Sequence, residues 1–247
     1  MMDFSTKWAT GTRESSLFIG VQQPQTQRQF FYQEYWKIIR EIADKLPKDA
    51  RILEIGCGRG TILQYLRSQG FENIAGLDNS DEALALARQN LGYGAELVNG
   101  EALKLPFAAQ EFDLVISMGV SEHIDNFGRF FYEQLRVLKL GGWLVCMTVP
   151  DKFSVQALNI FGKDSYYRSA NSVTQYKMFL EKMTDHPVAE LWVNPYPLFT
   201  PIPVWLERAI TKLYLKIHWL RGIIKSYPFS GSRLACQSHF LITRRSS

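Results

Sequence analysis

The sequence is short of the residues on which several common chemistries depend. It has four histidines and only three cysteines among its 247 residues, and Cys57, Cys146 and Cys236 lie far apart. An odd and scattered set of cysteines excludes a disulfide framework and favours a reducing compartment. No nucleophile, base and acid in the pattern of a triad can be recognised, so covalent catalysis is not indicated.

Long apolar runs are also missing. No stretch of about 18 apolar residues occurs, and the first residues lack the apolar core of a secretion signal. We therefore expect a cytoplasmic protein, or one that is attached to a membrane only from outside. The length and the apolar fraction of 46% suit one large domain over residues 1–247, with an elaboration.

The net positive charge is confined to one stretch. The net charge is +4, and residues 205–225 carry five basic side chains and one acidic one. A basic excess confined to one segment is a poor match to a nucleic-acid surface. The same segment, within a helix expected over about 203–225, has one apolar stripe and two flanking tryptophans, Trp205 and Trp219. Two interpretations stay open: peripheral contact with a membrane through residues 205–225, or a helix packed on the domain.

The most informative stretch is residues 51–60, Arg-Ile-Leu-Glu-Ile-Gly-Cys-Gly-Arg-Gly. Ile52, Leu53 and Ile55 predict a short buried strand, and a helix is expected from Thr61. The alternating glycines predict a tight turn that a ligand can approach without meeting a Cβ atom. Because open α/β sheets bind ligands at the carboxyl ends of their strands, we expect a cofactor turn here.

The spacing excludes two common cofactor motifs. The dinucleotide motif needs Gly or Ala where Thr61 stands, and a phosphate loop needs a lysine that is absent. The pattern of an acid followed by three alternating glycines instead resembles the first motif of the class I S-adenosylmethionine-dependent methyltransferases. The resemblance implies S-adenosylmethionine as cofactor, with an acid suited to its ammonium and sulfonium groups. The expected contacts are Glu54, Gly56, Cys57, Gly58 and Gly60, with Cys57 as a small filler.

A second acid follows at the end of the next expected strand, residues 74–77. Asp78 lies about 20 residues beyond the turn, where an acid binds the ribose hydroxyls in nucleotide-binding units. It could instead cap the following helix, although Ser80 suits that role better. We expect Asp78, with Asn79 beside it, to contact the cofactor.

Two further segments continue the resemblance. Residues 99–107 resemble the family's loop whose acid meets the adenine amino group. Glu101 stands in place of the usual Asp, with Gly100 and Ala102 on either side, while Leu103 and Phe107 are read as turn packing. Further on, Ser117 ends the expected fourth strand, residues 112–117, and Ser117 and Met118 are expected beside the cofactor.

Residues 117–124 resemble the segment found in quinone and polyprenyl-phenol O-methyltransferases. Glu122 and His123 match it, but Gly119 replaces a glutamate that serves those relatives as a metal ligand. We therefore expect no metal. His123 is the candidate catalytic residue, as a general base, and the alternative is a hydrogen bond to the backbone at the junction.

The order of elements predicts a Rossmann-like, doubly wound, mostly parallel seven-stranded sheet whose last strand is antiparallel. A helix over residues 24–46 precedes the cofactor-binding core, 48–150, and residues 151–247 form the substrate-side elaboration. Tyr32 and Trp36 of the first helix either cover the cofactor or pack on the sheet. The glycines at 141 and 142 are expected to cap the helix at 127–138, and the last strands are expected at 188–193 and 236–243.

The resemblance implies methyl transfer to a small, partly apolar acceptor, with a lipid-like molecule among the candidates. A non-catalytic cofactor-binding or membrane-associated module of the same fold stays open as the alternative. Aminopropyltransferases share the fold, but their acidic acceptor residues after the fourth strand are missing from residues 117–120.

Overall fold

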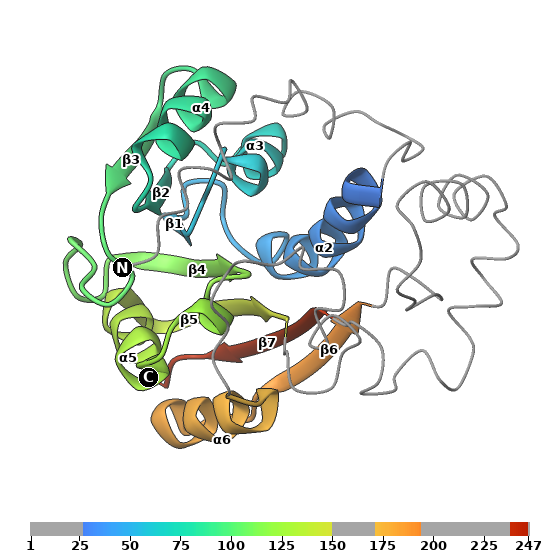
Figure 1. The fold of residues 1–247 in the computed structure, drawn as a ribbon, viewed down its shortest axis with the longest axis vertical. Helices are drawn as coiled ribbons and strands as arrows, with labels where there is room; N and C mark the ends of the chain where they lie inside the picture. The colour runs from blue at the N-terminus through green and yellow to red at the C-terminus, as the bar shows by residue number, and fades with distance from the viewer. Residues whose placement is uncertain (1–26, 150–170, 194–237, 247) are drawn as a thin grey trace, which may run out of the picture.

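The computed structural model describes residues 27–149, 171–193 and 238–246 (Figure 1). In chain order the elements are α2 (Gln27–Ala43), β1 (Ile52–Ile55), α3 (Thr61–Ser68), β2 (Ile74–Asp78), α4 (Asp81–Leu91), β3 (Ala95–Asn99), β4 (Phe112–Met118), the short 3-10 helix η2 (Ser121–His123), α5 (Phe127–Val137), β5 (Leu138–Thr148), α6 (Val173–Thr184), β6 (Ala189–Val193) and β7 (Ser238–Arg244). The predictions for residues 1–23, for the insertion at 151–168 and for the helix at about 203–225 lie outside these ranges.

The seven strands form one sheet in the order β3-β2-β1-β4-β5-β7-β6. Strands β1 to β5 pair in parallel, whereas β7 is antiparallel to both of its neighbours. The central strands β1, β2 and β4 consist largely of apolar residues because both of their faces are covered. The predicted fold class is confirmed.

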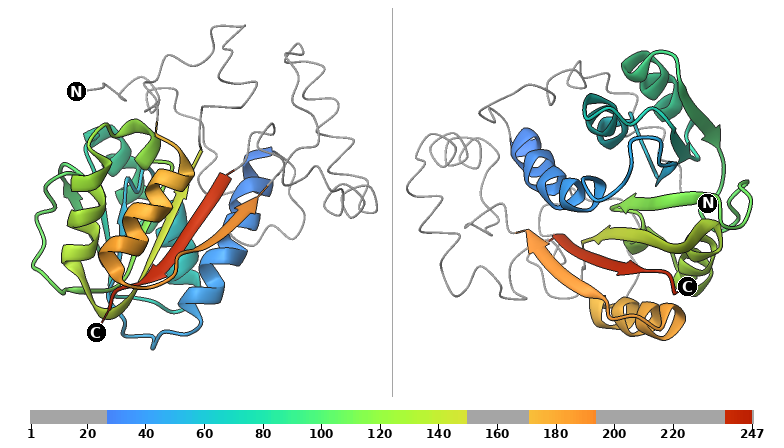
Figure 2. Two further views of the ribbon diagram at one scale, coloured as in Figure 1. Left: turned by 90° about the horizontal axis from the view of Figure 1, so that it is seen from below. Right: turned by 180° about the vertical axis from the view of Figure 1, so that it is seen from behind.

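Helices cover both faces of the sheet (Figure 2). Helices α2, α3 and α4 pack on one face against a core that includes Ile52, Ile116 and Phe240. Helices α5 and α6 pack on the other face, where Leu53, Val115 and Leu241 lie. Alternate residues of each strand thus enter different cores, as the two-residue period of a strand requires. No helix in the described ranges is both long enough and apolar enough to span a bilayer.

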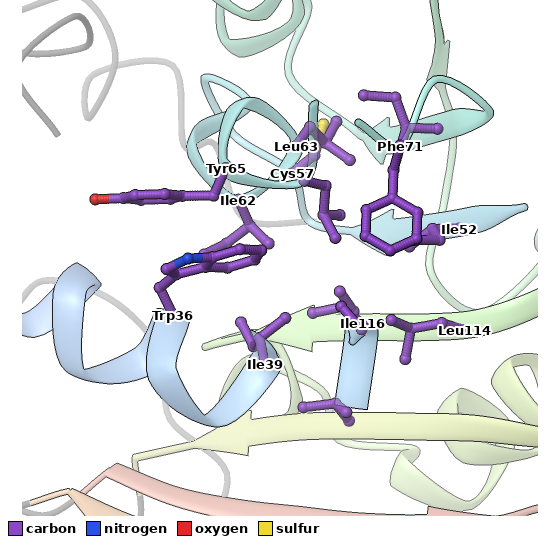
Figure 3. Close-up of a cluster of buried hydrophobic side chains, with 14 of the residues drawn as sticks. Trp36, Ile39, Ile52, Cys57, Ile62, Leu63, Tyr65, Phe71, Leu114 and Ile116 are labelled. Carbon is purple, nitrogen blue, oxygen red and sulfur yellow. The ribbon is translucent and has the colours of Figure 1, made fainter. Parts of the chain in front are cut away.

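Helix α2 is part of the core. The Trp36 indole stacks on the Tyr65 ring of α3, with centroids 5.2 Å apart and planes 15° apart, and Ile39 lies over Ile116 of β4 (Figure 3). Tyr35 reaches β7, where its hydroxyl hydrogen-bonds the Ser238 hydroxyl. Trp36 is 9% exposed and packs on α3, whereas coverage of the cofactor by Tyr32 or Trp36 stays a prediction.

One local prediction is wrong. Residues 141 and 142 do not cap α5, because the helix ends at Val137 and Leu138 is already extended as the first residue of β5. Gly142 instead passes close to neighbouring backbone, where a Cβ atom would lie 3.0 Å from the Asp113 carbonyl oxygen. The chain thus passes from helix to strand within one residue, and both glycines lie within β5.

Candidate functional site

The turn after β1 has the glycine geometry that the sequence predicts. Gly56, Gly58 and Gly60 have φ values of 68°, 53° and 75°, in the left-handed region that other residues rarely adopt. A Cβ atom on Gly56 would lie 2.4 Å from Cγ2 of Val120, and one on Gly60 would lie 2.8 Å from Cδ1 of Leu91. The turn therefore brings backbone into places where no side chain fits. We call residues 56–60 the glycine turn.

Asp78 joins the glycine turn to the second strand. Its carboxylate accepts a hydrogen bond from the Gly58 N–H at 2.8 Å and another from the Ser80 N–H at 3.0 Å. Ser80, not Asp78, caps α4, because its hydroxyl accepts from the Ala83 N–H. The carboxylate therefore lies against the turn at the carboxyl edge of the sheet, where a ribose ligand is expected. Asn79, the next residue, is exposed.

Glu54 lies beneath the glycine turn and is only 3% exposed. Burial, reinforced by the nearby Asp78 carboxylate, raises the pKa of Glu54 well above its ordinary value of 4.5, although a hydrogen bond from the Leu63 N–H opposes the shift. Among the described residues, its Oε2 atom is buried without a hydrogen-bond partner. Such an atom indicates a polar or cationic partner that the protein itself does not supply.

Cys57 fills the space between the turn and β2. Burial, together with the Glu54 and Asp78 carboxylates, raises the pKa of its thiol well above the ordinary value. A protonated, buried thiol is a poor nucleophile, so the residue suits the predicted role of a filler. Its sulfur would lie 2.8 Å from a Cβ atom on Gly76, which explains why β2 carries a glycine there.

The loop after β3 begins beside Asp78. The Gly100 N–H donates to the Asp78 carbonyl at 3.0 Å, and Asp78 is in register with Asn99 of the neighbouring strand. Glu101 follows and is exposed, and Ala102 is half-buried. The fold therefore brings Glu101 to the same edge of the sheet as Asp78, as the predicted contacts to adenine and ribose require.

Helix α5 holds this loop by a set of contacts that sequence reasoning missed. Arg136 donates to the carbonyls of Leu105 and Phe107 at 2.9 Å each, and the Glu133 carboxylate accepts from the Leu105 N–H at 2.9 Å. Arg129 adds a bond to the Leu103 carbonyl. We call Arg129, Glu133 and Arg136 the loop latch. Its only sequence signal is the alternation of charge at three- and four-residue spacing on α5.

Glu133 is the centre of the loop latch and is 2% exposed. Burial alone would raise the pKa of Glu133, but hydrogen bonds from Arg136 and the Leu105 N–H, with the charges of Arg136 and Arg129, lower it. Its oxygens lie 2.9 Å from Arg136 Nη2 and 3.0 Å from Arg129 Nη2. The carboxylate is thus ionised and fixed.

Ser117 and Met118 lie at the end of β4. The Ser117 side chain is fully buried and donates to Gln134 of α5 at 3.1 Å, so it points into the protein rather than toward the glycine turn. Met118 is half-buried and packs against the core beneath α2 and α3. Contact of these two residues with a cofactor stays a prediction, and for Ser117 it would be through the backbone.

Glu122 and His123 lie on η2, just beyond β4. Glu122 is 5% exposed and accepts a hydrogen bond from the Thr148 hydroxyl at 3.4 Å. His123 is half-buried, and its backbone N–H donates to the Val120 carbonyl. Base catalysis by His123 stays a prediction. Within the described ranges, no group of three or more His, Cys, Asp or Glu residues is placed to hold a metal ion.

Comparison with known proteins points to one family. A family model described as a methyltransferase domain matches residues 53–146. Phthiotriol/phenolphthiotriol dimycocerosates methyltransferase 1 of Mycobacterium ulcerans is 38% identical over 98 residues, which are 38% of this chain and 36% of that protein. Fatty-acid O-methyltransferase of Mycolicibacterium smegmatis is 35% identical over 107 residues, 42% of this chain and 39% of that protein. The match therefore spans well under half of either relative.

Solved structures share the fold. Geranyl diphosphate C-methyltransferase from Streptomyces coelicolor, solved with Mg²⁺, geranyl diphosphate and S-adenosyl-L-homocysteine, superposes with a TM-score of 0.64 and 14% identity, covering 98% of this chain and 97% of that one. A SAM-dependent methyltransferase from Archaeoglobus fulgidus gives 0.62 and 16%, covering 98% and 100%. At these identities the likeness speaks for the fold alone. Residues 53–146 match the methyltransferase-domain family, and together with the fold around them they support the class I S-adenosylmethionine-dependent methyltransferase superfamily for this chain.

Proposed function

We propose that this chain binds S-adenosylmethionine at the glycine turn and transfers its methyl group to a small, lipid-like acceptor. The observation that carries the proposal is the Asp78 carboxylate, which two backbone N–H groups fix against the glycine turn. A carboxylate held in this way at the end of the second strand is oriented for the two hydroxyls of a ribose before the ligand arrives.

The other residues of the site suit the remaining parts of that ligand. The unpartnered Oε2 atom of Glu54 supplies negative charge beneath the turn, and Glu101 lies one strand away from Asp78. When bound, S-adenosylmethionine supplies a methyl carbon on a positively charged sulfur. A raised pKa means that burial of the Glu54 carboxylate is unfavourable without a cation, so a cationic ligand would stabilise its ionised form.

The protein's own contribution is to align the reacting groups. Positive-φ glycines let the backbone approach the ligand, the loop latch fixes the loop that carries Glu101, and the buried core under α2 keeps the turn rigid. Ordering of two reactants in this manner can supply on the order of 7–11 kcal/mol of the barrier.

The acceptor class rests on the relatives. Their names specify a fatty acid in one case and phthiotriol/phenolphthiotriol dimycocerosates in another. A related rice protein, 32% identical over 136 residues, is named as a 2-methyl-6-phytyl-1,4-hydroquinone methyltransferase. We therefore infer an acceptor with an apolar chain and an oxygen-bearing head group.

Calorimetric titration with S-adenosylhomocysteine tests the cofactor site. We expect wild type to bind and Asp78→Asn to bind at least about tenfold more weakly, because a hydrogen bond to a charged group contributes about 1.5–3 kcal/mol. Asp113→Asn is the matched control, since Asp113 also accepts from a backbone N–H, that of Arg51 at 2.8 Å, but lies at the other end of its strand. Absence of binding by folded wild type would overturn the proposal.

A transfer assay tests the acceptor. Labelled S-adenosylmethionine is incubated with oleic acid and, separately, with an isoprenoid hydroquinone in detergent micelles. Label in either product supports a lipid-like acceptor and excludes a non-catalytic module. If S-adenosylhomocysteine binds but neither compound is methylated, the cofactor assignment stands and the acceptor class is wrong.

A further inference from the structure

Four polar side chains from separate elements gather at the carboxyl end of the sheet, on the face that carries α5 and α6. Thr148 ends β5, His239 lies directly opposite it on β7, and Glu190 is on β6. Glu122 of η2 joins them through the Thr148 hydroxyl. Thr148 is fully buried and His239 is 9% exposed. Buried polar groups clustered in this way at the ligand edge of a sheet indicate function.

His239 is held by one carboxylate. Its Nδ1 atom lies 3.0 Å from Oε1 of Glu190, and the two side chains are 11% and 26% exposed. The register accounts for the contact, because Glu190 is opposite Leu241 and is therefore a diagonal neighbour of His239 on the same face. Among the described residues no hydrogen bond to Nε2 of His239 is found.

This contact determines which imidazole nitrogen carries the proton. An ionised carboxylate only accepts hydrogen bonds, so the hydrogen between Glu190 and His239 belongs to Nδ1. In the neutral ring Nε2 then has a lone pair and acts as a base. A carboxylate that holds Nδ1–H while Nε2 faces the substrate is the arrangement by which a catalytic imidazole is oriented in hydrolases.

The sheet register places His239 near the expected reaction. Met118, the last residue of β4, pairs with Met147, and the next residue of β5, Thr148, pairs with His239. His239 is therefore level with the end of β4, two strands away. Since neighbouring strands lie about 4.8 Å apart, its Cα atom is about 9.5 Å from that strand. An acceptor lying across the ends of β4 and β5 can reach the imidazole.

We infer that His239 is the general base for a hydroxyl acceptor and that Glu190 positions it; the inference rests on the proposed methyl transfer. Nε2 takes the proton as the acceptor O–H bond breaks, and the oxygen electron pair forms the new bond to the methyl carbon. The electron pair of the broken sulfur–carbon bond stays on sulfur, which leaves S-adenosylhomocysteine. The imidazolium then returns its proton to water. His123, the candidate from the sequence, is the rival for this role.

Substitution of three histidines tests this assignment. With the isoprenoid hydroquinone as acceptor, we expect His239→Gln to lower kcat/KM by about 10²–10⁴-fold, the range for general base catalysis, with unchanged affinity for S-adenosylhomocysteine. His186→Gln is the matched control, because His186 is exposed in the turn before β6. The same loss in His123→Gln, with none in His239→Gln, would move the role to His123 and overturn the inference.

Two further measurements separate a base from a structural residue. Added imidazole should restore part of the activity of His239→Gly, which a packing role would not allow. Transfer to oleic acid, already ionised at neutral pH, needs no base and should be nearly unaffected by His239→Gln. If wild type methylates oleic acid but no hydroxyl compound, the base assignment is wrong while the proposed function stands; if it methylates neither, both fail.

The positioning role of Glu190 has its own readout. In ¹⁵N-labelled protein, nitrogen–proton correlation spectra should show neutral His239 protonated at Nδ1, with the signal assigned by its loss in His239→Gln. Glu190→Gln should shift the ring toward the other tautomer and lower kcat/KM by at least about tenfold. A neutral His239 protonated at Nε2 in wild type contradicts the inference whatever the activity.

Discussion

One nearly fully buried glutamate lies beneath the glycine turn and another lies in the loop latch, and their surroundings differ. Glu54 lies among backbone groups near another acid, and its pKa is raised; Glu133 lies between two arginines, and its pKa is lowered. A cationic ligand can therefore compensate the negative charge of Glu54 beneath the glycine turn, whereas the Glu133 carboxylate is already compensated by two arginines of the protein. A buried acid thus indicates a binding site when its partner is missing and a brace when its partner is present.

The largest expected effect is on the latch. Glu133→Gln removes the charge that Arg136 and Arg129 share, and it leaves two guanidinium groups facing a neutral amide. We expect the free energy of unfolding to fall by about 2–4 kcal/mol, less than for a fully buried pair because both arginines are partly exposed. Urea denaturation measures the change. A loss below about 1 kcal/mol would mean that the latch does not brace the loop.

The glycine turn should be more sensitive to backbone shape than to charge. Gly56→Ala places a Cβ atom on a residue with a left-handed backbone, which costs about 1–2 kcal/mol. The same Cβ atom would also clash with the Val120 side chain. We expect a total loss of about 2–3 kcal/mol, with weaker binding of S-adenosylhomocysteine.

The double variant with Val120→Ala separates the two causes. It should recover the steric part, about 1 kcal/mol, in a double-mutant cycle measured by urea denaturation. Additive losses would show that the contact with Val120 does not limit the turn.

The two glutamates should give opposite pH dependences. The raised pKa of Glu54 means that the folded state holds its proton at higher pH than the unfolded state. Stability from this group is therefore lost as pH rises above about 4.5, by about 1.4 kcal/mol per unit of pKa shift. The lowered pKa of Glu133 contributes stability that is present above its ordinary value and lost as pH falls through the folded value.

Thermal unfolding between pH 4 and 8 separates these contributions. Glu54→Gln should be more stable relative to wild type as pH rises, and Glu133→Gln should be relatively less stable as pH rises. Parallel curves for the two variants would remove the contrast between the two regions.

The smallest effect is expected for an exposed ion pair between an arginine and a glutamate. Glu96 lies 2.7 Å from Arg51, and its side chain is 48% exposed. Glu96→Gln should change the free energy of unfolding by less than about 0.5 kcal/mol and leave binding of S-adenosylhomocysteine unaltered. A larger effect would show that distance alone, rather than burial, sets the strength of these pairs.

The sheet was predictable from the sequence because its signals are local. Residues 52–55, 74–78 and 112–118 are short, mostly apolar runs followed by turns, and each became a strand within a residue or two of its expected bounds. The end of α5 was not predictable in this way. Gly141 and Gly142 are residues typical of a helix C-terminus. However, Leu138 pairs with Phe112 of β4, so the strand begins before the chain reaches these glycines. Tertiary pairing overrides the local preference there.

Only the part of the site whose residues lie close together in the sequence was predictable. Glu54, the three glycines and Asp78 lie within a single strand-turn-helix-strand unit, so their spacing carries the information. His239 and Glu190 come from strands whose register cannot be read from one sequence, and their contact needs β7 to pair with β6. The loop latch escaped notice for the same reason, because Glu133 and Leu105 are joined only by the packing of α5.

The position of β7 has a consequence for how the protein is made. This strand lies between β5 and β6, but it comes after both in the chain, separated from β6 by residues 194–237. While a ribosome is still adding those residues, β5 and β6 each present an open hydrogen-bonding edge, and such edges invite pairing with other chains. A lower level of expression should therefore raise the soluble yield, because fewer unfinished chains then expose these edges to one another at the same time.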